Sequence, residues 1–364
     1  MPINIRNLFK RRSKKFLGID IGTLSVRVVE VGRKGQISYL ENYGELMLSS
    51  VDEESFKVVK KSALSLSNKE VAKTIQAICG EAGIQTKEVN FSIPDFCSFF
   101  TSFKLPVMSK EELPEAVRYE VRPYIPLPLS EITLDWSITE GEISKTPLKI
   151  LVVAVPNEVV VQYQEIAHLS NLKLKILEPE VFALARSLVK NKATEKVKSL
   201  IDIGARSTTC SILEKGIFKT NHSFNIAGNE LTETIAKSLN IDYNKAEELK
   251  RKYGLLPDTA ISEEAPQKIR RILVPLIDLI LEEIKKIFRN FYQEDGKEIG
   301  EIVLAGGLAS MPGLKEYFSA ELKKEVVLAN PFLNIACPPI LTDTLKEIGP
   351  TFAIATGAAL KGLE

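Results

Sequence analysis

Apolar segments of strand length recur along the chain, and two of them share one pattern. Residues 17–21 and 200–203 are largely apolar runs with an aspartate near the end, and each leads through a glycine turn into a second apolar run, at 26–31 and 210–213. Short apolar runs bounded by turn residues predict buried strands. The pattern therefore predicts two similar β-hairpins that lie far apart in the sequence.

The residue types at the two turns suit a phosphate site. Gly22 and Gly204 lack a Cβ that would hinder backbone N–H groups from approaching an anion. Asp20 and Asp202 would hold the waters of a Mg²⁺ ion, which keeps several waters and takes few carboxylates. Each copy alone could be a simple turn at a strand end, an interpretation that the duplication weakens. Further candidate donors to phosphate are Thr23, Ser25, Arg27, Ser207, Thr208 and Thr209.

A compact α/β unit is expected between the hairpins. The pattern predicts strands at 99–105, 134–139, 150–155 and 174–177 and helices at 110–122 and 157–169, in the order β-α-β-β-α-β. Ser109 and Glu112 stand at capping-box spacing before the first of these helices. Upstream, apolar residues at helical spacing predict a helix over 71–78.

The second half of the sequence is predicted to be mostly helical. Residues 228–292 have helical periodicity, with breaks expected at Pro257 and Pro266. A buried strand at 302–305 ends in Gly306-Gly307. The helix expected at 350–360 is rich in alanine and glycine, which would permit close packing between lobes.

Composition narrows the function classes. A chain of 364 residues is long enough for two or more domains, and its net charge of +1 does not indicate a nucleic-acid binder. The four cysteines are scattered and read as reduced thiols, and with only two histidines a histidine-based zinc site or a Ser-His-Asp triad is not expected.

No apolar run reaches the roughly 18 residues of a membrane span. Residues 3–15 are basic and partly amphipathic. They would form either a weak anchor on anionic lipid or a solvated tail.

The ordered motifs resemble those of the actin-like ATPase superfamily, which implies a two-lobed α/β fold around ATP and Mg²⁺. By this resemblance Asp20 and Asp202 lie near Mg²⁺, and Glu178, in Glu178-Pro179, is the catalytic carboxylate that positions a water. Gly306, Gly307 and Met311 would flank the adenine, with Gly228 among the nucleotide contacts. Glu247 and Lys250, three apart on one helix face, resemble a pair that contacts ribose and base. A solvated helix face is the alternative for them.

Several segments point to one branch of this superfamily. The inserted unit resembles the SHS2-type subdomain of the division protein FtsA. Residues 119–126, Asp135-Trp136, 330–332 and 350–357 resemble the PilM family of type IV pilus assembly. The expected subdomains are a first lobe of 1–96, 178–198 and 345–364, an insert of 97–177, a second lobe of 199–227 and 299–344, and a helical subdomain of 228–298.

The PilM resemblance implies a scaffold at the cytoplasmic face of the inner membrane that binds ATP and captures the N-terminal cytoplasmic tail of the membrane protein PilN. It would link the membrane platform to the assembly motors and hydrolyse ATP slowly, if at all. The expected tail groove involves Tyr124, Ile125, Pro126 and Trp136, which could equally be core residues.

Three other interpretations stay open at this point. One is an FtsA-like filament-forming ATPase, although FtsA uses an amphipathic C-terminal tail on membranes and this chain ends directly after its closing helix, at Glu364. The others are a small-molecule kinase, for which no catalytic aspartate base is evident, and the cytoplasmic part of a type II secretion platform protein.

Overall fold

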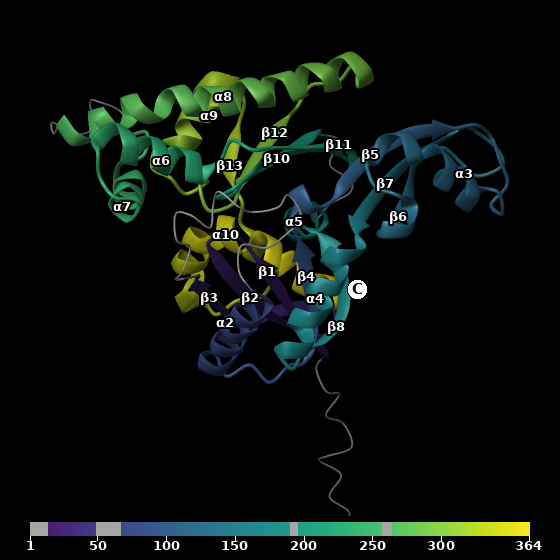
Figure 1. Ribbon diagram of the computed structural model, residues 1–364, viewed down its shortest axis with the longest axis horizontal. Helices are drawn as coiled ribbons and strands as arrows, with labels where there is room; N and C mark the ends of the chain where they lie inside the picture. Colours follow the sequence, from purple (N-terminus) through teal and green to yellow (C-terminus); the bar gives the residue numbers. More distant parts are fainter. Residues whose placement is uncertain (1–13, 49–66, 190–195, 257–263) are drawn as a thin grey trace, which may run out of the picture.

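A computed structural model describes residues 14–48, 67–189, 196–256 and 264–364. Two five-stranded sheets organise the molecule, one in each lobe (Figure 1). Residues 3–13 of the basic N-terminal segment and Pro257 lie outside the described residues, whereas the last two residues of that segment, Lys14 and Lys15, lie in β1 (Lys14–Ile21). No helix in the described ranges is long and apolar enough to cross a membrane.

The two sheets have matching topology, as the sequence duplication predicts. Each consists of three antiparallel strands in a meander, joined on one side by two parallel strands. The first sheet has the order β3-β2-β1-β4-β8 and the second β11-β10-β9-β12-β13. The strands of the first are β1 (Lys14–Ile21), β2 (Ser25–Lys34), β3 (Ile37–Met47), β4 (Glu88–Ile93) and β8 (Lys173–Pro179); those of the second are β9 (Lys198–Ile203), β10 (Thr208–Glu214), β11 (Ile217–Phe224), β12 (Glu301–Ala305) and β13 (Val326–Leu328).

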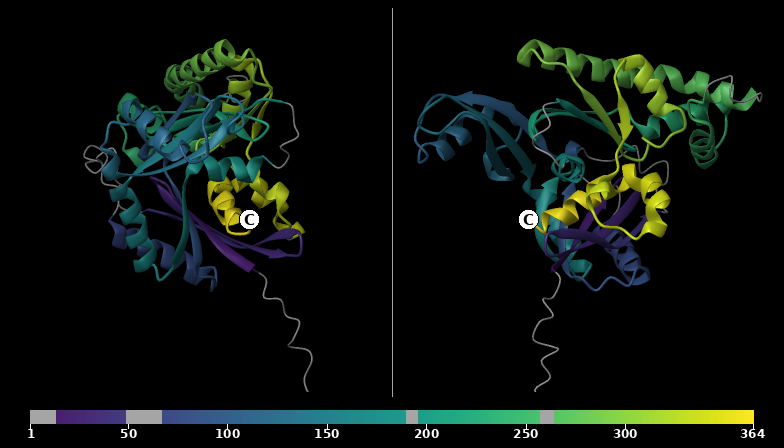
Figure 2. Two further views of the ribbon diagram at one scale, coloured as in Figure 1. Left: turned by 90° about the vertical axis from the view of Figure 1, so that its right-hand side faces the viewer. Right: turned by 180° about the vertical axis from the view of Figure 1, so that it is seen from behind.

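Helices on both faces bury the first sheet. One face packs on α2 (Asn68–Glu81) and α4 (Asn157–Leu169), where Tyr163 of α4 meets Phe91 of β4 edge to face. The other face packs on α10 (Thr342–Lys361), which also crosses α5 (Glu180–Leu188) and so lies between the lobes (Figure 2). The small-residue helix is confirmed, but it begins earlier than predicted and carries Pro350 inside it.

Glycines allow α10 to approach its neighbours closely. A Cβ on Gly357 would lie 1.8 Å from the carbonyl oxygen of Ala183 in α5, and one on Gly18 would lie 2.0 Å from that of Ala355. Because real Cβ atoms do not approach backbone so closely, only glycine permits these contacts. They fix α10 between β1 and α5.

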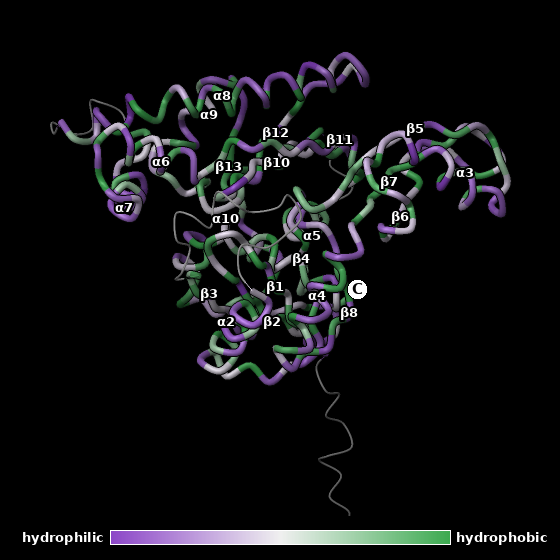
Figure 3. Tube along the Cα trace, viewed as in Figure 1, coloured by the Kyte–Doolittle hydropathy of each residue, from purple (hydrophilic) through white to green (hydrophobic). Residues whose placement is uncertain are grey.

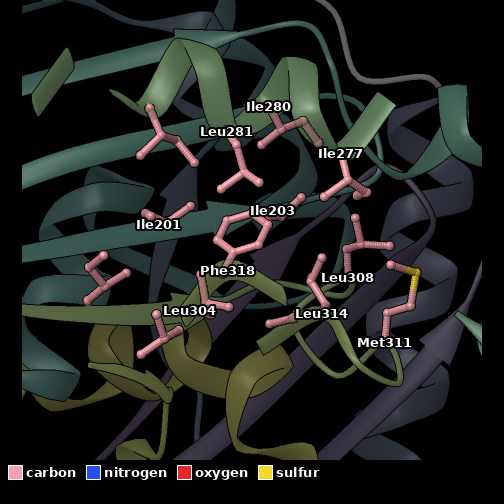
Figure 4. Packing of buried hydrophobic residues seen from close by; sticks show 14 of the residues in the cluster. Ile201, Ile203, Ile277, Ile280, Leu281, Leu304, Leu308, Met311, Leu314 and Phe318 are labelled. Atoms are coloured by element: carbon pink, nitrogen blue, oxygen red, sulfur yellow. The ribbon is translucent and has the colours of Figure 1, made fainter. Parts of the chain in front are cut away.

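The second lobe is covered by four helices of the described chain. They are α6 (Gly228–Leu239), α7 (Tyr243–Tyr253), α8 (Glu264–Asp295) and α9 (Leu314–Leu322). Hydrophilic and hydrophobic residues alternate along α8 (Figure 3), and its buried face packs on the sheet through Ile277, Ile280 and Leu281, which surround Phe318 of α9 (Figure 4). The break expected at Pro266 is wrong: this proline lies in the first turn of α8, where its missing N–H is not needed.

The insert projects from the first lobe (Figure 1). Its own sheet has three antiparallel strands in the order β5-β7-β6, with α3 (Leu113–Glu120) packed on one face. The predicted order β-α-β-β-α-β occurs, but β8 pairs with β4 in the first-lobe sheet and α4 packs there too. The insert's sheet is therefore confined to β5 (Phe99–Leu105), β6 (Ile132–Glu140) and β7 (Leu148–Pro156).

Short turns complete the described chain. The Ser109 N–H and hydroxyl both donate to Glu112, over 2.8 and 2.9 Å, but the capping box predicted at Ser109 is wrong, because α3 begins at Leu113 and its N-cap is Glu112. The 3₁₀ segments are η2 (Asp95–Cys97), η3 (Arg122–Tyr124), η4 (Leu129–Glu131), η6 (Pro331–Asn334) and η7 (Pro339–Leu341).

Candidate functional site

A cleft of about 340 Å³ lies between the lobes, and the tips of both hairpins reach it. The two turns are closed alike: the Gly22 N–H donates to Ser25 O and the Gly204 N–H donates to Ser207 O, each over 3.0 Å. The duplicated sequence thus builds two equivalent turns that face one space.

Most of the predicted nucleotide residues line this cleft. Glu178, Thr208 and Thr209 do not. Those that do are Asp20, Gly22, Thr23, Ser25, Arg27, Asp202, Gly204, Ser207, Gly228, Glu247, Lys250, Gly306, Gly307 and Met311.

Hydroxyl groups of the hairpins have different orientations from those expected. Thr208 Oγ1 donates to Ile226 O over 2.7 Å, and Thr209 Oγ1 lies 2.6 Å from Ser223 Oγ on the neighbouring strand. Ser25 reaches the cleft, but its hydroxyl donates to Glu45 over 2.7 Å. Thr23 and Ser207 are therefore the better candidates for hydroxyl donors to phosphate.

Acidic side chains from both lobes gather beside the turns. Asp20 accepts from Ser92 over 3.0 Å and lies 3.3 Å from Arg27, and burial nevertheless raises its pKa. Burial and the nearby Asp20 charge raise the pKa of Asp202 to about 7. Burial, with the charges of Asp20, Asp95 and Asp202, raises the pKa of Glu180 well above its usual value. Mutual repulsion of this kind is relieved by a bound cation.

The residues fit a hydrated magnesium ion. Asp202 Oδ1 is buried without a hydrogen-bond partner, so one acceptor of the acidic group is free to hold a ligand or its water. In the part of the chain that the structure describes, no three acidic, cysteine or histidine side chains converge closely enough to hold a metal together. Mg²⁺ is bound by one or two carboxylates and retains its waters, and Asp20 and Asp202 supply one carboxylate from each lobe.

Glu178 does not occupy the position expected for it. Its Oε2 accepts from Arg186 Nη2 over 2.8 Å, and Arg186 Nη1 also donates to Gly357 O over 3.1 Å. Glu178 is thus an ion-pair partner that ties β8 to α5 and α10. Two residues along, at the start of α5, Glu180 lines the cleft. The sequence contains both carboxylates, and only the strand end, after Pro179, decides which faces the cleft.

Glu247 and Lys250 share one face of α7, as their spacing predicts, and both line the cleft. Lys250 Nζ lies 2.6 Å from Glu247 and donates to Gly228 O over 2.9 Å and to Thr232 Oγ1 over 2.7 Å. Burial lowers the pKa of Lys250. Lys250 is buried, Glu247 is half-buried and both are connected to α6, so the solvated-face alternative does not hold.

Glycine is required at the turn after β12. Gly306 has φ of +87°, and a Cβ there would lie 2.4 Å from Asp202 Oδ1. The Gly306 N–H donates to Pro350 O of α10 over 2.9 Å, which joins the lobes at the base of the cleft.

Sequence reasoning missed several residues of the site. Phe96 and Arg206 both line the cleft and contact one another, and Asp95 is a buried carboxyl beside Val181 and Asp202. A usable signal existed, because Asp95 follows β4, the strand parallel to β1, and parallel strands end at the same edge of a sheet.

The residues predicted to line a tail groove differ in their exposure to solvent. Ile125 is buried in the core of the insert and Trp136 packs partly against it. Tyr124 stacks on Phe103 with 5.8 Å between ring centroids, yet 49% of it is exposed, and Pro126 is exposed. The core alternative therefore holds for Ile125, while Tyr124 and Pro126 are accessible.

Comparison with known proteins gives a consistent picture. A family model described as type IV pilus assembly protein PilM matches residues 18–363. The cell division protein FtsA of Enterococcus faecalis is 26% identical over 370 aligned positions, which cover 88% of this chain and 81% of that protein.

Comparison with solved structures is consistent with the family match. A PilM-PilN type IV pilus biogenesis complex superposes with a TM-score of 0.82 at 25% identity, covering 96% of this chain and 98% of that one. MreB5 of Spiroplasma citri bound to AMPPNP has a TM-score of 0.52 at 14% identity, with 95% of both chains covered. The MreB5 likeness shows the two-lobed actin-like fold.

Proposed function

Since the chain belongs to the PilM family of type IV pilus assembly proteins, we propose that it is an ATP-binding adaptor which captures the cytoplasmic tail of a PilN-type membrane protein. It would act at the cytoplasmic face of the inner membrane and link the membrane platform to the assembly motors. The observation that carries the nucleotide part is the pair of matched turns around the free Asp202 oxygen.

Different residues of the cleft would bind different parts of the nucleotide. Backbone N–H groups near Gly22 and Gly204, with Thr23 and Ser207, would bind phosphates, and Asp20 and Asp202 would hold waters of Mg²⁺. Glu247, Lys250 and Met311 would lie at the nucleoside end. When bound, Mg²⁺ would neutralise phosphate charge and relieve the repulsion among the acids.

Slow hydrolysis would depend on Glu180. Its carboxylate lines the cleft, from where it could orient an attacking water and accept its proton. Glu180→Gln should abolish phosphate release while leaving ATP binding. Glu178→Gln is the matched control, because it removes a carboxylate two residues away that does not reach the cleft, and its release rate should stay near that of the parent.

Tail binding would use the insert. Within the described residues, its edge strands β5 and β6 each pair with β7 alone. An extended tail can add to such an edge while its side chains fill nearby pockets. Tyr124 and Pro126 are exposed near this sheet. The solved PilM-PilN complex supports a PilN-type partner for a chain of this family.

The central test is nucleotide binding with and without Mg²⁺, followed by titration with a PilN-type tail peptide. Wild-type protein should bind ATP more tightly with Mg²⁺, and Asp202→Asn should lose most of that gain. Asp135→Asn, at an exposed position on the insert, should keep it. A wild-type protein that binds no nucleotide would rule out the adaptor in this form.

An FtsA-like filament is the second candidate, favoured by the FtsA relative that matches 88% of the chain. ATP binding without peptide binding, together with sedimentable polymers at micromolar protein, would favour it over the adaptor.

A further inference from the structure

Among the described residues, four cationic side chains line the cleft, and three of them pair with carboxylates. Arg27 pairs with Asp20 and Glu45, and Lys250 and Arg251 share Glu247. Within the described ranges, Arg206 makes no ion pair; its guanidinium instead lies 4.4 Å from the centroid of the Phe96 ring. It is thus the cleft cation with charge left to offer a ligand.

The position of Arg206 places that charge at the phosphate end. Arg206 is on the second turn, between Gly204 and Ser207, and it lines the cleft together with Phe96. Arg206 therefore belongs to the turn that would bind phosphate, whereas Lys250 and Arg251 belong to α7. Stacking on an aromatic face holds a guanidinium plane in place and leaves its edge N–H groups available.

The acidic side chains create a need for such a cation. Asp20, Asp202 and Glu180 repel a polyphosphate, and each further phosphate adds negative charge beside them. An arginine can meet a terminal phosphate with two parallel hydrogen bonds.

We propose that Arg206 binds the terminal phosphate of the nucleotide, so that the cleft distinguishes a nucleoside triphosphate from a diphosphate. This inference rests on the proposed nucleotide site. Its partner Phe96 belongs to the first lobe, in η2, directly before β5 of the insert. A shift of Arg206 from Phe96 toward phosphate thus changes a contact that joins the second lobe to the entry of the insert.

The experiment compares affinities for AMPPNP and ADP, each with Mg²⁺, in four proteins. Arg206→Gln should reduce the preference for AMPPNP over ADP by about tenfold, the loss expected for one charge-assisted hydrogen bond. Arg206→Lys keeps the charge but not the planar fork, so it should reduce the preference by a smaller factor. Arg251→Gln is the matched control: it removes a cleft arginine already paired with Glu247 and should change both affinities by the same factor.

The outcomes separate the two levels of the proposal. Wild-type protein without nucleotide affinity rules out the nucleotide site itself. Nucleotide binding in which Arg206→Gln weakens AMPPNP and ADP equally, or alters neither, overturns the role of Arg206 and leaves the site standing. An equal loss of preference in Arg251→Gln also overturns it, because general cleft charge would then be the cause. If Arg206→Gln does not fold, the preference of Arg206→Lys for AMPPNP over ADP tests the role of Arg206 instead.

Discussion

Asp95 shows how a residue outside the cleft can affect the charge within it. Its Oδ1 accepts from the Val181 N–H over 3.4 Å, and the side chain is buried between the first lobe and the second hairpin. Burial, opposed by the Val181 hydrogen bond and assisted by the Asp202 charge, raises its pKa to about 8. Two carboxyl groups from different lobes thus compete for ionisation in the same buried region.

This competition predicts a pH dependence of stability. Because the folded pKa values of Asp95 and Asp202 exceed their unfolded values, the folded state binds more protons between about pH 4 and pH 8, and stability falls as pH rises through that range. Nucleotide-free protein should melt at a lower temperature at pH 8.5 than at pH 6. Asp95→Asn should flatten this slope, whereas Asp135→Asn should not. A melting temperature that rises between pH 6 and pH 8.5 would contradict the assignment.

Element packing depends on α10, which touches the first sheet, α5 and the turn after β12. Its alanines 353, 355, 358 and 359 are fully buried, and Gly357 meets the backbone of α5 directly. The same helix places Pro350 and Ile354 at the cleft. The position of α10 therefore affects both the packing of the core and the geometry of the cleft.

Gly357→Ala should be strongly destabilising for this reason. The added methyl cannot fit 1.8 Å from Ala183 O, so α10 and α5 must separate, at a cost of about 3 kcal/mol or more. Gly80→Ala, near the end of α2 with nothing within 4 Å of its Cβ, should instead stabilise by about 0.5–1 kcal/mol. Denaturant unfolding of both variants measures the difference. Similar stabilities would show that the helix crossing tolerates a side chain.

At the scale of the whole molecule, the insert is attached to the second lobe as well as to the first. Lys219 Nζ of β11 lies 2.6 Å from Glu140 at the end of β6 and 3.3 Å from Glu214 of β10. Alongside, Phe182 of α5 contacts Phe100 of β5 at 6.1 Å and Phe218 of β11 at 5.1 Å between centroids. A change in the angle between the lobes must therefore strain or break contacts of the insert.

Removal of the Lys219 contact should loosen the insert. In Lys219→Met, spin-label distances between α3 and α8 should become more broadly distributed, because Glu140 loses its partner in the second lobe. Lys297→Met is the matched control, since Lys297 pairs with Glu214 but not with the insert. Unchanged distributions in Lys219→Met would show that packing alone, through Phe182, holds the insert.

Sequence pattern alone predicts the two hairpins and the order of most elements, and the family resemblance adds most of the remaining cleft residues. Local pattern suffices for these, because an apolar run fixes a strand and glycine fixes a turn, and a duplicated motif signals a duplicated structure. Asp20 and Asp202 followed from spacing and residue type, whereas Gly306 and the Glu247–Lys250 pair were assigned to the site through the family resemblance.

Tertiary structure decided which side chains face the cleft and how the insert is attached. Glu178 and Glu180 have the same chemistry, but Glu178, at the end of β8, pairs with Arg186, whereas Glu180, at the start of α5, lines the cleft. The assignment of β8 to the first sheet, and the contact of Arg206 with Phe96, depend on pairings between segments far apart in sequence. Sequence periodicity predicts which residues are buried. Which residues they contact depends on how the lobes are arranged.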